Sequence, residues 1–104
     1  MIKKIKPTED FILKNDLKLE KPKLYNIIFY NDPVTTTQFV IDILKTIYQK
    51  KEYDAEEITN FIDFIGKGIV ATYPYEVAEQ KMLETQTLIK KKGCPLRVSL
   101  NLSC

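Results

Sequence analysis

The distribution of hydrophobic and polar positions changes near Lys23 and is regular beyond it. Three segments, residues 24–30, 68–73 and 96–102, are rich in apolar, aromatic and β-branched residues and predict β-strands. The first is almost continuously apolar, which is typical of a mostly buried strand, and a turn signal follows it at residues 31–33. The last alternates with a period of two, which predicts a strand with one apolar face.

Between these strands, apolar residues recur at helical spacing and predict two helices. The first is expected from about residue 36 to residue 50, and Thr35 with Gln38 matches a capping box at its start. The second is expected to open on a capping box of Asp54 and Glu57 and to end near Gly66. Its apolar stripe, which we expect to face the core, consists of Ile58, Phe61, Ile62 and Ile65.

A third helix is expected after Pro74, with acidic residues near its start and three lysines, residues 90–92, at its end. The predicted order is therefore β-α-α-β-α-β. This is an α+β sandwich in which three helices pack on a small three-stranded antiparallel sheet. The 104 residues have room for one domain, which we place at residues 24–104, with residues 1–23 as a flexible N-terminal extension.

Composition narrows the possible functions. The chain has no histidine, which removes Ser-His and Cys-His catalytic pairs and the commonest zinc ligand, so we expect no enzyme, no metal and no cofactor. Sixteen basic residues against 14 acidic ones are too small an excess to indicate a nucleic-acid partner. Cys94 and Cys104 are interpreted as reduced thiols. No apolar run suits a membrane span or a signal peptide, which favours the cytoplasm. We also expect a monomer.

Four separated motifs carry a resemblance to a known family. They are residues 25–32 (Tyr-Asn-Ile-Ile-Phe-Tyr-Asn-Asp), Thr35 with residues 39–42 (Phe-Val-Ile-Asp), residues 66–68 (Gly-Lys-Gly) and residues 76–81 (Glu-Val-Ala-Glu-Gln-Lys). In this order they resemble ClpS, the adaptor of the ATP-dependent Clp protease. The resemblance implies a non-enzymatic adaptor that binds bulky hydrophobic N-terminal residues of N-degron substrates and delivers them to the N-domain of the ClpA unfoldase.

The resemblance places the site for the substrate's N-terminal amine at Asn31, Asp32 and Asp63. The family has a second acid where this chain has Pro33, and a histidine where this chain has Asp63. One interpretation is that the carboxylate has moved across the pocket, because Asp63 restores from the helix an acceptor that Pro33 removes from the loop. The alternative is that Asp63 is solvated and that the protein regulates the unfoldase with weak or altered N-terminal recognition.

The resemblance also implies a hydrophobic pocket for the N-terminal side chain, formed by Thr37, Val40, Ile41 and Ile62. Val40 and Ile62 lie on the apolar stripes of their helices and would be apolar for packing alone. Thr37 stands where the family often has methionine. Because threonine is shorter, we expect a roomier entrance that tolerates β-branched or larger N-terminal residues.

For the unfoldase, the resemblance implies a contact through Glu76 and Lys81 of the third helix. From the residues alone, a solvated helix face would be the favoured explanation of both residues, and only the resemblance reverses that preference. Residues 1–23 would then be the segment that engages the unfoldase during delivery.

Two other classes of protein remain as alternatives. The β-α-α-β-α-β order also occurs in ribosomal stalk domains, which keeps open a ribosome- or nucleic-acid-associated module, although a single arginine weakens it. Asp32 and Asp63 could also act as a carboxylate pair of the kind that glycosidases use, although so short a chain offers little room for a catalytic cleft.

Overall fold

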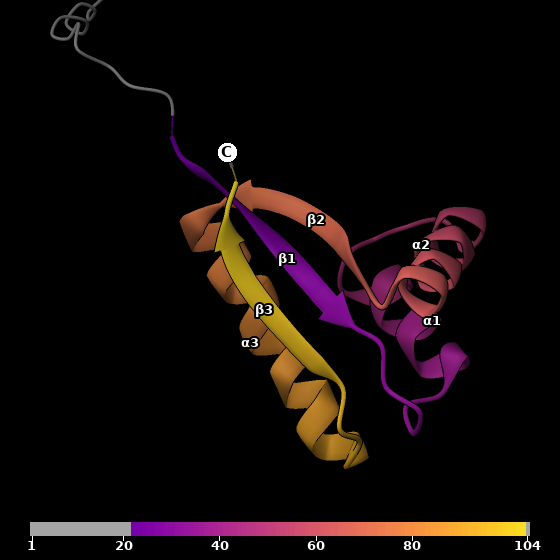
Figure 1. Cartoon of the computed structure of the whole chain (residues 1–104). Coiled ribbons are helices and arrows are strands. Elements are labelled where there is room, and N and C mark those ends of the chain that lie inside the picture. The colour runs from indigo at the N-terminus through magenta and orange to yellow at the C-terminus, as the bar shows by residue number, and fades with distance from the viewer. Residues whose placement is uncertain (1–21, 104) are drawn as a thin grey trace, which may run out of the picture.

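The computed structural model of the protein describes residues 22–103. Six elements follow one another in the predicted order (Figure 1). They are β1 (Leu24–Tyr30), α1 (Thr37–Thr46), α2 (Glu52–Ile65), β2 (Lys67–Pro74), α3 (Tyr75–Lys92) and β3 (Arg97–Leu102). Of the predicted extension, residues 1–23, only the last two residues fall within the described part of the chain.

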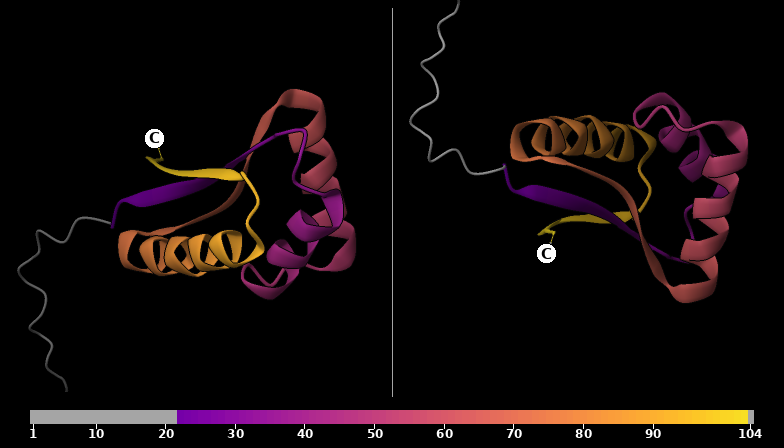
Figure 2. Two further views of the ribbon diagram at one scale, coloured as in Figure 1. Left: turned by 90° about the horizontal axis from the view of Figure 1, so that it is seen from below. Right: turned by 90° about the horizontal axis from the view of Figure 1, so that it is seen from above.

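β1 is the central strand of a three-stranded antiparallel sheet with the order β2-β1-β3. α3 lies along one face of this sheet, and the α1–α2 hairpin packs at the end where β1 finishes and β2 begins (Figure 1 and Figure 2). The predicted α+β architecture is therefore confirmed. Among the described residues no helix covers the opposite face of the sheet, which we call the open face.

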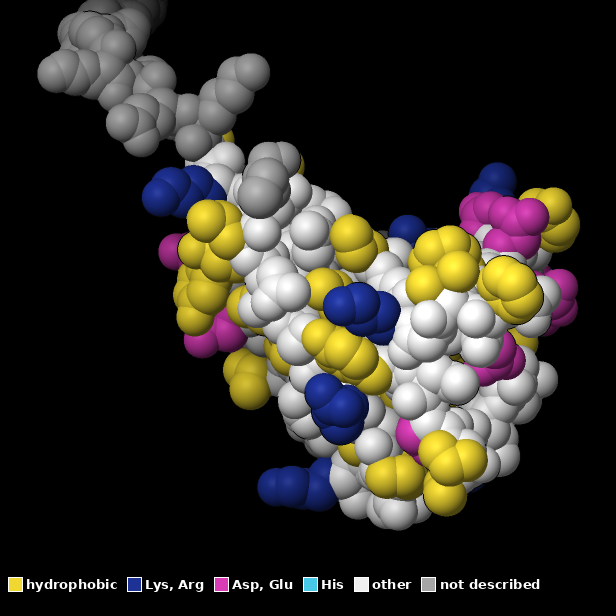
Figure 3. Space-filling model, in the orientation of Figure 1, with side chains coloured by type: hydrophobic (Ala, Val, Ile, Leu, Met, Phe, Trp, Pro, Cys, Tyr) yellow, Lys and Arg dark blue, Asp and Glu magenta, His cyan; other side chains and the backbone are white. Residues whose placement is uncertain are grey.

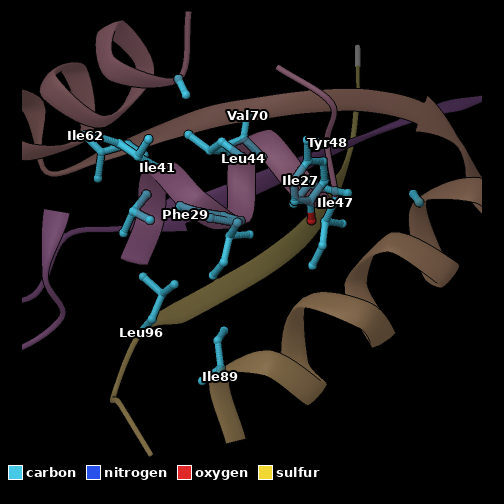
Figure 4. Close-up of a cluster of buried hydrophobic side chains, with 14 residues drawn as sticks. Ile27, Phe29, Ile41, Leu44, Ile47, Tyr48, Ile62, Val70, Ile89 and Leu96 are labelled. Atoms are coloured by element: carbon cyan, nitrogen blue, oxygen red, sulfur yellow. The ribbon is translucent and has the colours of Figure 1, made fainter. Parts of the chain in front are cut away.

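The core lies between the helices and the covered face of the sheet (Figure 4). Ile27 and Phe29 of β1 are fully buried there, against Ile43 and Leu44 of α1. Burying each of these side chains contributes roughly 1.5–3 kcal/mol to stability. The ring of Tyr48 meets that of Phe29 edge to face, with the ring centroids 5.9 Å apart. These contacts fix the α1–α2 hairpin against the end of β1.

The N-cap of α1 is Thr36, and the prediction of a capping box on Thr35 was wrong. Thr36 Oγ1 accepts a hydrogen bond from the Phe39 amide at 3.2 Å. Gln38, the other half of the predicted box, donates instead to the Asp42 carboxylate one turn further on. Thr35 is thereby left in the loop that follows β1.

α1 ends at Thr46, about four residues before the predicted end. Gln49 adopts the left-handed backbone conformation, with φ at 56°, which terminates the helix. The amide of Lys50 then donates to the carbonyl oxygen of Leu44 at 2.9 Å, so one of the last carbonyl groups of α1 is satisfied by the turn.

α2 begins at Glu52, two residues before the predicted capping box at Asp54. Its N-cap, Lys51, makes no side-chain hydrogen bond to the helix, so the start of α2 is set by packing and by the acidic residues of its first turn. The helix ends at Gly66 as predicted, and a φ of 109° there suits glycine alone.

The apolar stripe of α2 is only partly buried, which corrects the prediction that all of it faces the core. Ile62 is buried and Ile58 is half-buried, but Phe61 is 54% and Ile65 is 56% exposed. The buried line of α2 instead consists of Ala55, Thr59 and Ile62, spaced four and three residues apart. Small residues on this line let α2 approach its neighbours closely.

The remaining boundaries lie within one residue of the prediction. β2 extends from residue 67 to residue 74 where 68–73 was expected, and β3 begins at Arg97 where residue 96 was expected. α3 follows Pro74 directly and ends before Gly93, which adopts the left-handed conformation.

Candidate functional site

A small cavity lies where the end of β1 meets the start of α1 and the last turns of α2. Its volume of about 20 Å³ is room for about one water molecule. Residues from β1, the loop after it, both helices of the hairpin and the segment before β3 line it. Six of the seven residues predicted for substrate binding are among them, namely Asn31, Asp32, Thr37, Val40, Ile62 and Asp63.

Asp32 holds the loop between β1 and α1 in shape. Its Oδ1 accepts hydrogen bonds from the amides of Val34 at 2.8 Å and Thr35 at 2.7 Å, the arrangement of an Asx turn. Partial burial acts to raise the pKa of Asp32. The nearby Thr35 hydroxyl and the two amide hydrogen bonds outweigh burial and lower that pKa. The carboxylate is therefore ionised at neutral pH.

Two oxygen atoms at this cavity are buried without a hydrogen-bond partner among residues 22–103. They are Oδ2 of Asp32 and Oγ1 of Thr35. An unpaired buried polar atom costs about 1–3 kcal/mol, and more when it is charged. Native structures contain few such atoms. An ionised carboxylate with one free oxygen, beside a free hydroxyl, is suited to accept hydrogen bonds from a cationic ligand.

The backbone brings Asn31 and Asp63 to the same cavity from different elements. The Asn31 amide donates to the carbonyl oxygen of Gly66 at 2.9 Å, which ties the loop after β1 to the end of α2. Asp63 lies three residues before Gly66, and its side chain lines the cavity while staying exposed. The cavity therefore carries two carboxylates, one of them fixed in a turn and the other on a helix at the rim.

The apolar part of the cavity comes from Val40 and Ile62, both buried, with the exposed Thr37 at the first position of α1. Ile41 was predicted in this wall but does not line the cavity. It is 6% exposed and belongs to the core cluster. One residue along a helix turns the side chain by about 100°, so Ile41 cannot share the direction of Val40.

Sequence reasoning missed five lining residues, Phe29, Tyr30, Thr35, Thr59 and Leu96. Thr59 is almost fully buried, and its hydroxyl donates to the carbonyl oxygen of Ala55 at 2.8 Å. Its position three residues before Ile62 on α2 was an available signal, because such residues share a helix face. Leu96 reaches the cavity through the tertiary fold, for which the local sequence holds no signal.

Glu76 and Lys81, the predicted unfoldase contacts, lie on α3, away from the cavity. Glu76 is exposed in the first turn of α3 and lines a shallow groove together with Pro22 and Lys23. Lys81 is half-buried, and its Nζ donates to the carbonyl oxygen of Ile47 at 2.8 Å. Lys81 thus has a role inside the molecule that the sequence did not reveal.

In the described part of the chain, no group of three or more carboxylate or thiol side chains is placed to hold a metal ion. None of its helices is both long enough and apolar enough to cross a membrane.

Comparisons with known proteins agree on one family. A family model described as ATP-dependent Clp protease adaptor protein ClpS matches residues 20–99. The ATP-dependent Clp protease adapter protein ClpS of Nautilia profundicola is 44% identical over 86 residues, which cover 83% of this chain and 89% of that protein. The ClpS adapter of Clostridium acetobutylicum is 38% identical over 96 residues, which cover 92% and 95%.

The fold comparison gives the same result. The structure of Agrobacterium tumefaciens ClpS2 bound to L-phenylalaninamide matches with a TM-score of 0.76 at 28% identity, over 80% of this chain and 100% of that one. Fold and sequence together define a protease adaptor. The chain belongs to the ClpS family of adaptors of the ATP-dependent Clp protease, and a Clp chaperone is the partner that membership implies.

Proposed function

We propose that this member of the ClpS family binds the free N-terminus of proteins that begin with a bulky hydrophobic residue and delivers them to a ClpA-type unfoldase. It acts in the cytoplasm as a binding protein and carries out no reaction itself. The observation that carries the proposal is the pair of unpaired oxygens, Asp32 Oδ2 and Thr35 Oγ1, at an apolar cavity with Asp63 on its rim.

The chemistry of this cavity suits a terminal ammonium group. An α-ammonium carries one positive charge and three N–H donors, whereas an internal peptide bond offers one neutral N–H. Hydrogen bonds to ionised groups are roughly twice as strong as neutral ones. Asp32 supplies a fixed carboxylate oxygen, Asn31 an amide oxygen and Asp63 a second charge, so a free N-terminus would satisfy atoms that are otherwise unpaired.

The related ClpS2 of Agrobacterium tumefaciens supports this choice of ligand. The molecule bound to that protein, L-phenylalaninamide, combines a free α-amine with an aromatic side chain. An amine beside Asp32 and a side chain directed toward Val40 and Ile62 would use the polar and apolar parts of the present cavity together.

The small size of the cavity favours a second candidate function, in which the protein regulates the unfoldase and binds N-termini weakly or with altered preference. A cavity of about 20 Å³ does not hold a bulky side chain, so binding requires its rim to open. Opening costs free energy, which lowers affinity. Thr37 is one of the exposed residues on this rim.

Fluorescence anisotropy with three labelled probes tests the proposal and separates the candidates. The probes are a peptide with a free N-terminal Phe, its N-acetylated twin and an oligonucleotide. We expect the free peptide to bind at least about tenfold more tightly than the acetylated one, since acetylation removes the charge and two donors. Equal binding of the two peptides would exclude amine recognition, and binding of the oligonucleotide alone would overturn the assignment.

Matched variants locate the amine site. Asn can form the same Asx turn as Asp, so Asp32→Asn keeps the loop while removing the charge, and we expect it to abolish the preference for the free amine. Asp42→Asn, on the exposed side of α1, is the control. Weak binding of every peptide, together with retained binding of the unfoldase N-domain, would support the second candidate.

Delivery is supported by the location of the predicted partner surface. Pro22 and Lys23, where the predicted extension joins the body, line the same groove as Glu76. A partner that contacts Glu76 and Lys81 on α3 would therefore meet residues 1–23 as they leave the body. An adaptor needs this arrangement if one partner is to contact both the surface of α3 and residues 1–23.

A further inference from the structure

The open face of the sheet ends in an apolar groove beside α2. This groove has a volume of about 460 Å³ and is lined by Ile28, Phe61, Ile65, Lys67, Gly68 and Ile69. Its apolar walls are unusually exposed, since Phe61, Ile65 and Ile69 each show more than half of their surface to solvent. Figure 3 shows apolar side chains gathered on α2 and on the adjoining part of the sheet. Single exposed apolar residues are ordinary, but a contiguous set indicates a contact surface.

The groove is built into the fold. A Cβ atom on Gly68 would lie 3.1 Å from Cδ2 of Phe61 and 3.1 Å from Cγ1 of Ile62, so the Phe61 ring rests directly on the backbone of β2. On the sheet, Ile28 and Ile69 are paired in the β1–β2 register and form the floor. Rigid walls of this kind lower the entropy cost of binding an apolar segment.

Two cations flank the groove on the open face. Tyr30 is opposite Lys67 in the β1–β2 register and opposite Arg97 in the β1–β3 register, so the three side chains share one face of the sheet. The Arg97 guanidinium lies 4.6 Å from the centre of the Tyr30 ring, which holds it on that face. An occupant of the groove should therefore combine apolar side chains with adjacent acidic ones.

We propose that residues 9–19 of this same chain occupy the groove. This segment reads Glu-Asp-Phe-Ile-Leu-Lys-Asn-Asp-Leu-Lys-Leu. It holds five apolar residues, Phe11, Ile12, Leu13, Leu17 and Leu19. Its three acidic residues, Glu9, Asp10 and Asp16, outnumber Lys14 and Lys18 by one. Among the residues outside the described part of the chain, it is the segment that matches both the apolar walls and the basic flank.

The N-terminal segment is long enough to reach. The described chain starts at Pro22, and β1 runs from Leu24 toward the groove, so that Leu24 and Ile28 lie about 14 Å apart. The nine residues from Leu13 to Pro22 span up to about 30 Å when extended. Leu13 can therefore lie over Ile28 with length to spare. A segment docked there is withheld from a partner until that partner competes for it.

A single introduced tryptophan tests the docking in the full-length protein, because the chain has no tryptophan of its own. We expect the emission of a Phe11→Trp variant to be blue-shifted and protected from acrylamide, and to be independent of protein concentration. Adding Ile69→Lys places a charge in the groove and should return the emission to that of solvent-exposed tryptophan. Leu83→Lys is the matched control, since Leu83 is 58% exposed on α3, outside the groove.

Each other outcome overturns the proposal. Solvent-like emission from Phe11→Trp, and equally from a second probe at Leu17→Trp, would show that the segment does not dock and leave the groove to a partner protein. A blue shift that grows with protein concentration would assign the groove to a second copy of the chain. A blue shift that survives Ile69→Lys would place the segment elsewhere, and circular dichroism checks that each variant is folded.

Discussion

Nζ of Lys81 on α3 donates a hydrogen bond to the carbonyl oxygen of Ile47, at the C-terminal end of α1, over 2.8 Å. A cation is favourable here because the last carbonyl groups of a helix are unpaired and carry partial negative charge. Beside it, the Thr85 hydroxyl donates to the Lys81 carbonyl oxygen at 2.8 Å and so accepts the 2.7 Å hydrogen bond from the Tyr48 hydroxyl. This joint fixes α3 to the α1–α2 hairpin, and therefore fixes the predicted partner surface relative to the cavity.

Lys81→Met and Glu76→Gln should separate stability from partner binding. Lys81→Met keeps the apolar stem but loses the hydrogen bond to Ile47, and we expect the free energy of unfolding to fall by about 1–2 kcal/mol. Glu76→Gln alters an exposed side chain and should change stability by less than about 0.5 kcal/mol. Both should weaken binding to the unfoldase N-domain. Urea denaturation and titration with that domain measure the two effects.

The result for Glu76→Gln decides where the partner binds. Unchanged affinity for the N-domain would move the partner surface away from the start of α3. If Lys81→Met left the unfolding midpoint unchanged, the hydrogen bond to Ile47 would contribute nothing measurable and Lys81 would act on the partner alone.

Tyr48→Phe should reduce the loss of stability at alkaline pH. Burial raises the pKa of Tyr48 from 10.0 to about 12. A raised pKa in the folded state means that stability is full below the unfolded pKa and is lost as the pH rises between these two values. Tyr48→Phe removes this slope. At neutral pH it should also cost about 0.5–1.5 kcal/mol for the lost hydrogen bond.

Urea denaturation at a series of pH values from neutral to strongly alkaline measures this effect. Tyr53→Phe is the comparison, because Tyr53 is exposed and makes its hydrogen bond to Glu57 at the surface. That hydrogen bond also raises the pKa of Tyr53, so Tyr53→Phe should remove a smaller part of the slope than Tyr48→Phe. A slope that Tyr48→Phe leaves unchanged, or that Tyr53→Phe removes equally well, would contradict the assignment.

The sequence predicted the element order because the strands and helices have distinct periods and because Gly66 marks a real helix end. It failed on Phe61 and Ile65, since helical spacing shows which residues are apolar but not how far the neighbouring elements extend over them. Tertiary packing determines which residues of α2 are buried, and the buried residues include Ala55 and Thr59.

The candidate site was likewise predicted only in part from the sequence. Asn31, Asp32 and Asp63 were predicted from a family resemblance, and the fold brings all three to one cavity. Leu96 was missed because its place in the lining depends on how the segment before β3 returns to the hairpin. The second role of Lys81 was missed for the same reason, since its partner Ile47 is 34 residues away in the sequence.

Binding of a free N-terminus should depend on pH only at the two ends of the range. Without histidine in the chain, no transition is expected near pH 6.5. Despite burial, the hydrogen bonds from Thr35 and Val34 lower the pKa of Asp32, so its charge persists into the acidic range and binding is lost only where this carboxylate is protonated. Above about pH 8 binding should fall again, because the peptide's own α-amino group loses its proton.

Peptide anisotropy measured from acidic to alkaline pH checks this profile. Asp32→Asn should remove the acidic limb together with most of the affinity. Asp32 also contributes to folding stability. This contribution is present above the pKa of Asp32 in the unfolded chain and is lost as the pH falls through its lower pKa in the folded protein. Circular dichroism must therefore accompany the binding measurements at acidic pH. A binding transition near pH 6.5 would contradict the carboxylate assignment.

Thr37→Met should narrow the entrance of the cavity. Thr37 is the first residue of α1, is exposed and lines the cavity, so a longer side chain there would extend over the opening. A β-branched side chain is widest next to the backbone, where the entrance constrains it most. We therefore expect an Ile-initiated peptide to bind about three- to tenfold more weakly, in the range of mild overpacking.

Gln38→Met is the matched control, because Gln38 is exposed on the same turn and does not line the cavity. Improved binding of the Ile-initiated peptide by Thr37→Met would show that Thr37 does not widen the entrance, and an equal loss in Gln38→Met would assign the effect to the helix start.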